Sequence, residues 1–240
     1  MPFPAMVQAR LKQKIPLASD VYEFIFELIE PSTIDFQSGQ FVLIYATNPA
    51  TGELISRAYS IASVPSQNNE LHIVIAIIKT GTLTPILDTW EIGHELQIQG
   101  PFGHFTLKSP ADRELIFVAT STGIAPFHSM ILDLLSKGDS RSMHVYFGVR
   151  HEENIFYQRE FETLAKQHPN LHFTLTLSQP FDAWKGSRCR VTALLPQQSF
   201  NPATTDVYMC GGKGMIDDVR AIFLQKGFDP SHLYFEQFFV

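Results

Sequence analysis

The sequence predicts an antiparallel β-barrel in the N-terminal half, followed by a doubly wound parallel α/β domain. Two observations predict this fold class. Up to about residue 108, short β-rich runs alternate with turn residues, and almost no helical pattern intervenes. Beyond about residue 113, apolar runs alternate with amphipathic helical patterns. Because Ser109-Pro110 interrupts the sequence between these two textures, the predicted domains are residues 1–109 and 110–240.

In the N-terminal half, β-branched and aromatic residues concentrate in five runs that predict strands. Turn formers such as Gly39, Gly52 and Gly100-Pro101 separate these runs. One short helix fits residues 83–89. Short strands at this spacing are typical of an antiparallel barrel or sandwich. The predicted strands cover residues 21–29, 40–46, 58–62, 71–78 and 95–99.

In the C-terminal half, four short apolar runs predict parallel strands that are buried on both faces. The helical spacing of apolar residues between them predicts three helices, and Gly227 is a plausible stop for the last. Sheets of this kind bind ligands at the carboxyl ends of their strands. The predicted strands cover residues 115–119, 145–149, 173–177 and 207–209, and the predicted helices cover 127–135, 158–166 and 215–225.

Composition excludes several classes of function. The chain of 240 residues carries 18 Lys+Arg against 24 Asp+Glu, and no two basic residues are adjacent, so we expect no nucleic-acid partner. Two cysteines, Cys189 and Cys210, are too few for a disulfide framework or a four-cysteine metal site. No run resembles a signal peptide or approaches 18 uncharged apolar residues, so we expect no membrane association and a cytoplasmic protein.

Two segments of the predicted barrel carry residue types suited to a phosphate-bearing aromatic ligand. The first is Arg57-Ala58-Tyr59-Ser60, in which strand alternation places the arginine and the tyrosine on one face. A guanidinium binds a pyrophosphate in a fork geometry, and a phenol ring stacks on a flat heterocycle. The second is Gly81-Thr82-Leu83-Thr84, whose backbone N–H groups and hydroxyls open the predicted helix. An exposed strand start and an ordinary helix cap explain these segments equally well when each is taken alone.

Two further segments follow predicted parallel strands. Ala119-Thr120-Ser121-Thr122-Gly123-Ile124-Ala125-Pro126 is a turn of small residues with proline near a helix start, where a dinucleotide pyrophosphate would lie. It lacks the Gly-x-Gly-x-x-Gly pattern of an ordinary dinucleotide-binding domain. Cys210-Gly211-Gly212-Lys213-Gly214-Met215 allows a ligand to approach the backbone closely, but it lacks the Ser or Thr of a nucleoside-triphosphate loop.

Taken together, the order and spacing of seven segments resemble the ferredoxin-NADP reductase superfamily. The resemblance covers nearly the whole chain. Besides the four segments above, it rests on Gly100-Pro101-Phe102-Gly103, Phe36-Gln37-Ser38-Gly39-Gln40-Phe41 and Phe147-Gly148-Val149-Arg150. The resemblance implies a flavin-binding barrel that holds FAD and a second domain that binds NAD(P)H, with hydride passing from nicotinamide C4 to flavin N5.

The resemblance also implies roles for particular residues. Arg57 would bind the FAD pyrophosphate, Tyr59 would lie against the flavin, and Ser60 would hydrogen-bond near N5. Cys210 would flank the nicotinamide ring, and Glu236 lies near the place where many members keep a carboxylate by the flavin. We therefore take Ser60, Cys210 and Glu236 as candidate catalytic residues. The remaining candidate cofactor-binding residues are Ala58, Ile75, Ala76, Ile77, Gly81, Thr82, Leu83, Thr84, Thr122, Gly123, Gly211 and Gly212.

The chain departs from the family pattern at Ser121, where the family usually carries glycine. The choice of pyridine nucleotide depends on Ser178-Gln179-Pro180. NADPH-specific relatives often place Arg or Lys there for the 2′-phosphate, so Gln179 favours NADH over NADPH. His168 and His172 share the spacing of a helical metal pair, but Pro169 breaks any common helix, and we predict no metal.

Three functions are consistent with this pattern. The first is an NAD(P)H oxidoreductase with bound FAD that passes electrons to a separate acceptor, either a ferredoxin-like protein or an oxygenase component. The chain has too few cysteines for the iron–sulfur domain that many relatives carry, so electrons would leave the flavin directly. The second is an NAD(P)H:flavin reductase for which free flavin is a diffusible substrate. The third, motivated by Ser121, is a non-enzymatic module that senses nucleotide or redox state.

Overall fold

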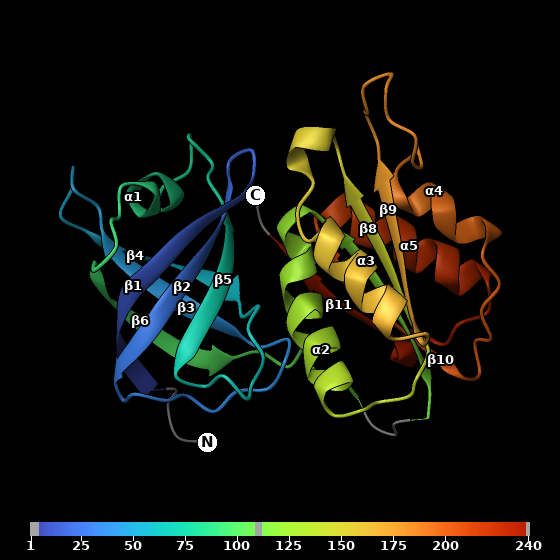
Figure 1. Cartoon of the computed structure of the whole chain (residues 1–240), viewed down its shortest axis with the longest axis horizontal. Helices are drawn as coiled ribbons and strands as arrows, with labels where there is room; N and C mark the ends of the chain where they lie inside the picture. The colour runs from blue at the N-terminus through green and yellow to red at the C-terminus, as the bar shows by residue number, and fades with distance from the viewer. Residues whose placement is uncertain (1–4, 109–111, 239–240) are drawn as a thin grey trace. The chain divides into compact units, whose positions relative to one another are not determined.

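In the computed structural model, which describes residues 5–108 and 112–238, the chain forms two compact units (Figure 1). Unit 1 contains the chain up to Leu107 together with helix α2 (Ala125–Ser136). Unit 2 contains residues 108–124 and 137–240. The boundary predicted between residues 109 and 110 lies outside the described residues and stays a prediction.

Unit 1 is an antiparallel barrel, as predicted. Its six strands form one sheet in the order β4-β3-β6-β1-β2-β5, so β4 and β5 are the two edges. A bridge between Ile61 and Ile73, and a hydrogen bond of 2.8 Å from the Ala62 N–H to the His72 carbonyl, join these edges and close the barrel. The strands are β1 (Ala5–Ala18), β2 (Val21–Glu30), β3 (Phe41–Thr47), β4 (Leu54–Ser60), β5 (Glu70–Ala76) and β6 (Glu95–Phe102).

The longest strand, β1, is missing from the sequence prediction. Its alternation is clear in the structure, because Val7, Ala9 and Leu11 are fully buried while Arg10 and Lys12 point to solvent. Each of these charged side chains pairs across the outer face, with Glu95 and Glu70 respectively. This period-two pattern is that of a half-buried strand, and the charged residues on its outer face make it less apolar than the predicted strands.

A second correction concerns the strand predicted at residues 58–62, which begins at Leu54 and ends at Ser60. It pairs with β3 in a hairpin whose register runs from Thr47 opposite Leu54 to Phe41 opposite Ser60. The other four predicted strands of the barrel have the predicted positions within three residues. The predicted short helix is α1 (Thr84–Asp88).

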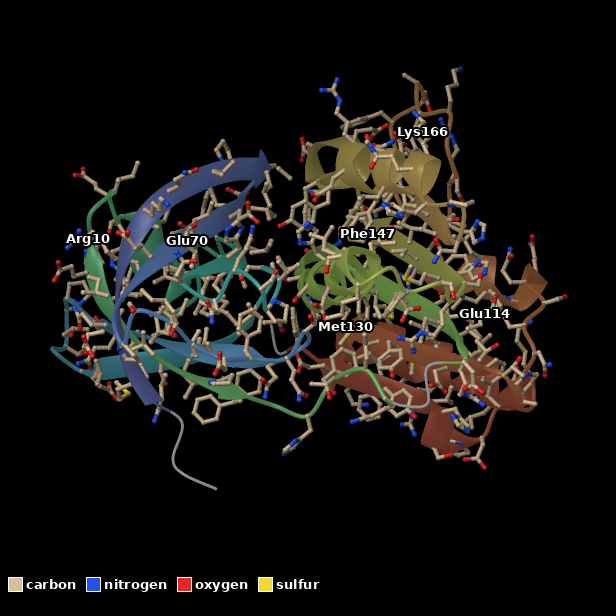
Figure 2. The ribbon with its side chains drawn as sticks, turned by 60° about the horizontal axis from the view of Figure 1, so that its bottom comes forward. Arg10, Glu70, Glu114, Met130, Phe147 and Lys166 are labelled. Atoms are coloured by element: carbon tan, nitrogen blue, oxygen red, sulfur yellow. The ribbon has the colours of Figure 1, made fainter. Side chains whose placement is uncertain are left out.

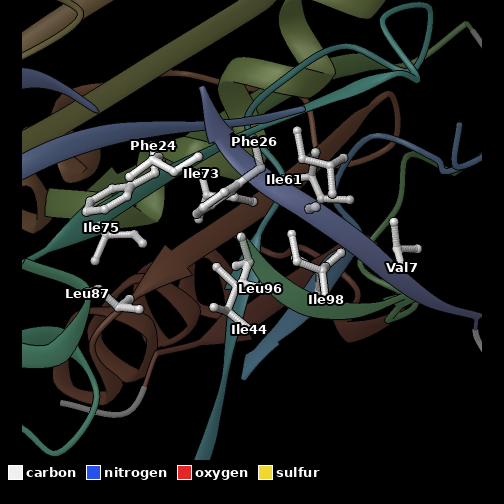
Figure 3. Close-up of a cluster of buried hydrophobic side chains, with 14 of the residues drawn as sticks. Val7, Phe24, Phe26, Ile44, Ile61, Ile73, Ile75, Leu87, Leu96 and Ile98 are labelled. Atoms are coloured by element: carbon white, nitrogen blue, oxygen red, sulfur yellow. The ribbon is translucent and has the colours of Figure 1, made fainter. Parts of the chain in front are cut away.

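The barrel interior is filled by aliphatic and aromatic side chains from all six strands and from α1 (Figure 3). Phe24 and Phe26 of β2 stack with ring centroids 6.1 Å apart, and Ile61 and Ile73 lie inside the closing bridge. Burying a side chain of this size contributes about 1.5–3 kcal/mol. This core therefore gives β4 and β5, the strands that carry the candidate flavin residues, a rigid support.

Unit 2 is a parallel sheet in the order β11-β10-β7-β8-β9. The chain runs outward from β7 to β8 and β9, then returns to the other side of β7 to form β10 and β11. The gap between the carboxyl ends of β7 and β10 is the switch point at which such sheets bind ligands. The strands are β7 (Glu114–Thr120), β8 (Met143–Val149), β9 (Leu171–Leu177), β10 (Thr205–Gly211) and β11 (Leu233–Gln237).

Helices pack on both faces of this sheet (Figure 1). On one face, α4 (Val191–Leu194), η3 (Leu195–Gln197) and α5 (Lys213–Gln225) cover apolar residues of β7, β8 and β10. On the other, Phe161 of α3 (Gln158–Gln167) stacks on Phe173 of β9 at 5.1 Å. The three predicted helices are confirmed, whereas α4 and the short turns η2 (Glu152–Asn154) and η4 (Pro230–His232) carried no periodic signal.

Among the residues that the structure describes, no helix is both long enough and apolar enough to cross a lipid bilayer.

Candidate flavin and nucleotide sites

The predicted pyrophosphate ligand Arg57 lies on the edge strand β4 with its side chain exposed. Its Nη1 donates a hydrogen bond of 2.8 Å to the carbonyl of its neighbour Ser56. Ala58 is also exposed, whereas Ser60 is buried at 5% relative exposure. Strand β4 therefore presents the Arg57 guanidinium to solvent, and its last residue, Ser60, is buried.

Tyr59 offers a buried hydroxyl to a ligand in unit 1. Its ring packs against the barrel core, and its hydroxyl oxygen is buried without a hydrogen-bond partner among the described residues. Burial raises the pKa of Tyr59 far above its ordinary value, and the nearby Arg57 only partly offsets this, so the hydroxyl keeps its proton. A buried hydroxyl without a partner costs about 1–3 kcal/mol, which a polar ligand atom would recover. The site thus fits a cofactor with polar groups beside a flat ring, as FAD has.

The turn at residues 81–84 precedes α1, as predicted, but most of its polar groups serve the fold. The Thr84 hydroxyl accepts a hydrogen bond from the Ile78 N–H and donates one to the Ile78 carbonyl, both at 3.0 Å. Leu83 is buried in the core at 2% relative exposure, so only its backbone faces a ligand. Thr82 is exposed and Gly81 half-buried. Of the predicted phosphate-binding groups, the Thr82 hydroxyl and the backbone are left for that role.

The end of β5 lies beside the end of β4, because the bridge from Ile61 to Ile73 joins the two strands. Ile75 and Ile77 point into the core, and Ala76 between them is half-buried. The Ile77 N–H donates to the Asp20 carbonyl at 2.7 Å. The structure therefore brings the two predicted flavin segments, residues 57–60 and 75–77, to the same seam of the barrel.

In unit 2, the two small-residue turns meet at the switch point between β7 and β10. The turn η1 (Ser121–Ile124) follows β7, and a Cβ atom added at Gly123 would lie 2.3 Å from the Cys210 carbonyl oxygen. Gly211, which has a φ of +151°, lies close to the end of β7, because a Cβ added there would be 2.4 Å from Oγ1 of Thr120. Only glycine fits at these two positions. Thr122 of this turn is half-buried, and a Cβ added at Gly212, the residue before α5, would meet nothing within 4 Å.

Cys210 and Glu236 occupy opposite positions on the neighbouring strands β10 and β11. The Cys210 side chain is fully buried, and burial together with the Glu236 carboxylate raises its pKa well above the ordinary value. The thiol is therefore neutral and is not a nucleophile. The Phe238 N–H donates to the Gly211 carbonyl at 2.9 Å, which fixes the chain after β11 against this turn. Cys210, Gly211 and Glu236 thus lie together, and the roles that the resemblance implies for them stay predictions.

The segment predicted to select the nucleotide follows β9 and is held by backbone bonds, from the Ser178 N–H to the Val149 carbonyl and from the Gln179 N–H to the Arg150 carbonyl. The nearby Arg188 donates to three backbone carbonyls, those of Phe181, Asp182 and Trp184. Its guanidinium is engaged in holding this loop. His172 stacks on His144 of the neighbouring strand, with ring centroids 4.6 Å apart.

Sequence reasoning overlooked two polar residues on α2. His128 and Ser129 are buried and hydrogen-bonded to the backbone just beyond the Arg57 segment. The available signal was the pair of polar residues in the middle of an otherwise apolar helix face.

Known proteins match both units. Residues 8–107 match the family described as Oxidoreductase FAD-binding domain, and residues 117–221 match Oxidoreductase NAD-binding domain. Over 239 residues the chain is 32% identical to Ferredoxin--NADP reductase B of Sorangium cellulosum, covering 96% of this chain and 97% of that protein. It is 30% identical to the reductase component of phenol 2-monooxygenase from a Pseudomonas species, over 85% of this chain but only 58% of that relative.

A solved structure has the same fold. The FAD/NAD binding domain of nitric oxide dioxygenase from Vibrio cholerae superimposes with a TM-score of 0.88 at 18% identity, covering 97% of this chain and 98% of that one. The fold, the two matched domain families and the full-length similarity to a ferredoxin-NADP reductase agree with each other. The chain therefore belongs to the ferredoxin-NADP reductase superfamily and is an NAD(P)H-dependent flavin oxidoreductase that uses FAD and a pyridine nucleotide.

Proposed function

We propose that the chain retains FAD and passes electrons from NADH to a separate acceptor protein, either a ferredoxin-like protein or an oxygenase component. The observation that carries the proposal is the seam of β4 and β5, where an exposed Arg57 lies near a buried Tyr59 hydroxyl that has no partner among the described residues. A cofactor held by such groups stays bound between turnovers. The separate acceptor is supported by relatives that are named as a reductase component and an electron transfer component of oxygenases. The two cysteines of this sequence are too few to form a four-cysteine cluster by themselves.

Each candidate residue has a limited physical task. Arg57 supplies charge for a pyrophosphate, and Tyr59 supplies a flat ring and a neutral hydroxyl. Gly123 and Gly211 lack the side chains that would otherwise keep the η1 turn and the end of β10 from approaching each other closely. The neutral Cys210 thiol excludes water beside the reacting ring without competing as a nucleophile. Bound FAD supplies the acceptor for hydride and NADH supplies the donor, so the protein contributes positioning and electrostatics.

The preference for NADH is part of the proposal. Gln179 lacks a charge for a 2′-phosphate, and Arg188 is held by three carbonyls of its own loop. To recruit Nη2 of Arg188, a 2′-phosphate would have to displace these bonds. We expect anaerobic reduction of the flavin by NADH to need at least tenfold less nucleotide than reduction by NADPH. Equal or reversed half-saturation would contradict the preference while leaving the reductase activity in place.

One observation favours the flavin reductase as a second function. The Thr84 hydroxyl is bonded to Ile78 and α1 has only five residues, so the pyrophosphate has fewer side-chain donors than the sequence predicted. A weaker hold on the pyrophosphate would let flavin exchange with solution.

One experiment separates the two functions. The purified chain is desalted, its flavin absorbance is compared with its protein content, and NADH is added under anaerobic conditions. Near-stoichiometric flavin that bleaches supports the bound-FAD oxidoreductase, whereas a colourless chain that oxidises NADH only with added flavin supports the flavin reductase. Arg57→Ala should lower retained FAD several-fold. Arg10→Ala, which removes an exposed and paired arginine from β1 of the same barrel, is the matched control.

A further inference from the structure

Helix α2 carries two buried polar side chains near its N-terminus. His128 has 6% relative exposure and Ser129 has none. Burying polar groups is unfavourable unless they are hydrogen-bonded, and apolar residues would fill the same space at no such cost. The other buried residues of the helix are Ala125, Pro126, Phe127, Met130, Ile131 and Leu134. The polar pair therefore contributes something besides apolar burial.

Both side chains bond to consecutive backbone carbonyls of the barrel. Oγ of Ser129 donates to the Ser63 carbonyl at 2.6 Å, and Nδ1 of His128 lies 2.9 Å from the Ala62 carbonyl oxygen. A carbonyl oxygen only accepts, so Nδ1 carries the proton in this bond. We call these two residues with their two carbonyls the α2 clamp. In addition, the Ser38 hydroxyl donates to the Ser129 carbonyl at 3.3 Å.

The packing around the α2 clamp leaves little space. A Cβ atom added at Gly39 would lie 2.0 Å from the Phe105 carbonyl oxygen and 2.4 Å from Cε of Met130, which is labelled in Figure 2. The rings of Phe105 and Phe127 are 5.9 Å apart. All these residues belong to unit 1. Apolar contacts alone permit small rotations of a helix, whereas two directional hydrogen bonds fix its rotation and its height.

The position of the α2 clamp in the chain connects it with both candidate sites. Ala62 and Ser63 follow Ser60 of the predicted flavin segment by two and three residues. At the other end, α2 begins at Ala125, directly after the η1 turn, whose Gly123 packs against the Cys210 carbonyl. The chain therefore passes directly from the η1 turn into α2, and α2 is hydrogen-bonded to the residues that follow the predicted flavin segment 57–60.

We propose that His128 and Ser129 are positioning residues for hydride transfer: the α2 clamp fixes the start of α2 and, through it, the η1 turn. Neither residue needs to touch a cofactor. Hydride transfer is sensitive to such positioning, because a displacement of about 1 Å can slow an oriented reaction by about 100-fold. The inference rests on the proposed function, since it assumes that the η1 turn binds the nucleotide.

The test compares Ser129→Ala and His128→Leu with the matched control Ser136→Ala. Ser136 lies on the same helix, and its hydroxyl donates to the carbonyl of Asp133 within the helix. Anaerobic rapid mixing of the FAD-bound chain with NADH gives the limiting rate of flavin reduction separately from the nucleotide dissociation constant. We expect the limiting rate to fall about tenfold or more in each clamp variant, with FAD content and the rate of reduction by dithionite unchanged. The control should keep the parent rate.

Two further measurements keep the outcome decisive. Hydrogen exchange of the amides of residues 120–125 should speed up in the clamp variants but not in Ser136→Ala, and this readout needs neither flavin nor nucleotide. His128→Asn, which restores a side-chain N–H near the Nδ1 position, should recover most of the rate. Lowered thermal stability with an unchanged limiting rate and unchanged exchange would overturn the proposal. If NADH and NADPH both fail to reduce the parent chain, the proposed function fails, and the exchange data still decide whether the clamp fixes the turn.

Discussion

Replacing Gly123 by alanine perturbs the closest backbone approach of unit 2. The added Cβ would lie 2.3 Å from the Cys210 carbonyl oxygen, 2.7 Å from its carbon and 3.0 Å from the Gly211 nitrogen. Ordinary van der Waals contact begins at 3.4 Å, so the separation has to grow by about 1.1 Å, the difference between 3.4 and 2.3 Å. All three neighbours are backbone atoms at the end of the inner strand β10, so no flexible side chain can yield.

The size of the effect follows from this displacement. Overpacking of a tightly packed site costs about 1–3 kcal/mol. For a chain of this length, each kcal/mol lowers the melting temperature by about 2–4 °C, so we expect a loss of about 2–12 °C. The turn that yields is η1, and a shift of about 1 Å in a binding turn can slow an oriented reaction by about 100-fold. We therefore expect the rate of flavin reduction to fall by up to about 100-fold together with this loss of stability.

Thermal unfolding by circular dichroism and anaerobic flavin reduction by NADH measure the two effects. Gly214→Ala is the control, because an added Cβ at Gly214 meets nothing within 4 Å and the residue lies in helix α5. Alanine is preferred over glycine inside a helix, so the control should melt at or slightly above the parent temperature. If Gly123→Ala melts within 1 °C of the parent and reduces flavin at the parent rate, the close approach between η1 and β10 is not a constraint.

Three more outcomes are expected. Ser121→Gly should raise stability by about 0.5–1 kcal/mol, because Ser121 has a φ of +51°, which a residue with a side chain adopts at a cost; a lower melting temperature would show that the hydroxyl is needed. Burial and the Glu236 carboxylate raise the pKa of Cys210, so its thiolate is scarce at pH 8. Iodoacetamide should therefore modify the half-buried Cys189 first, as measured by mass spectrometry, and equal labelling of the two cysteines would contradict this. Tyr59→Phe should stabilise the flavin-free chain by about 1–3 kcal/mol and weaken FAD retention, and destabilisation in unfolding experiments would refute the unpaired hydroxyl.

Each sheet contains one strand that the sequence analysis did not predict, β1 in the barrel and β11 in unit 2. Strands such as β7 and β8 are buried on both faces and therefore read as continuous apolar runs. The barrel strand β1 has one wet face, so its charged residues concealed it until its alternation was considered. The hydrogen bonds that join α2 to Ala62 and Ser63, more than sixty residues away in sequence, are contained in no local pattern.

The same distinction applies to the candidate sites. The motif order led to the family, but the roles of single residues came from resemblance and stay predictions. Local sequence did not reveal that the Thr84 hydroxyl is held by Ile78, because that bond depends on the path of the chain after β5. Nor did it reveal the contact of Gly123 with Cys210, which exists only because the sheet order places β10 beside β7.

The departure from the family pattern at Ser121 does not disturb the packing of the η1 turn. It motivated the interpretation of the chain as a non-enzymatic module, on the assumption that a side chain there keeps a dinucleotide away from the backbone. Ser121 is exposed, however, and the positions where a Cβ would collide are Gly123 and Gly211, both of which are glycine. Serine pays only a conformational cost for its positive φ, and the close approach is preserved where packing requires it. The substitution therefore affects the stability of the η1 turn and leaves its packing against β10 intact.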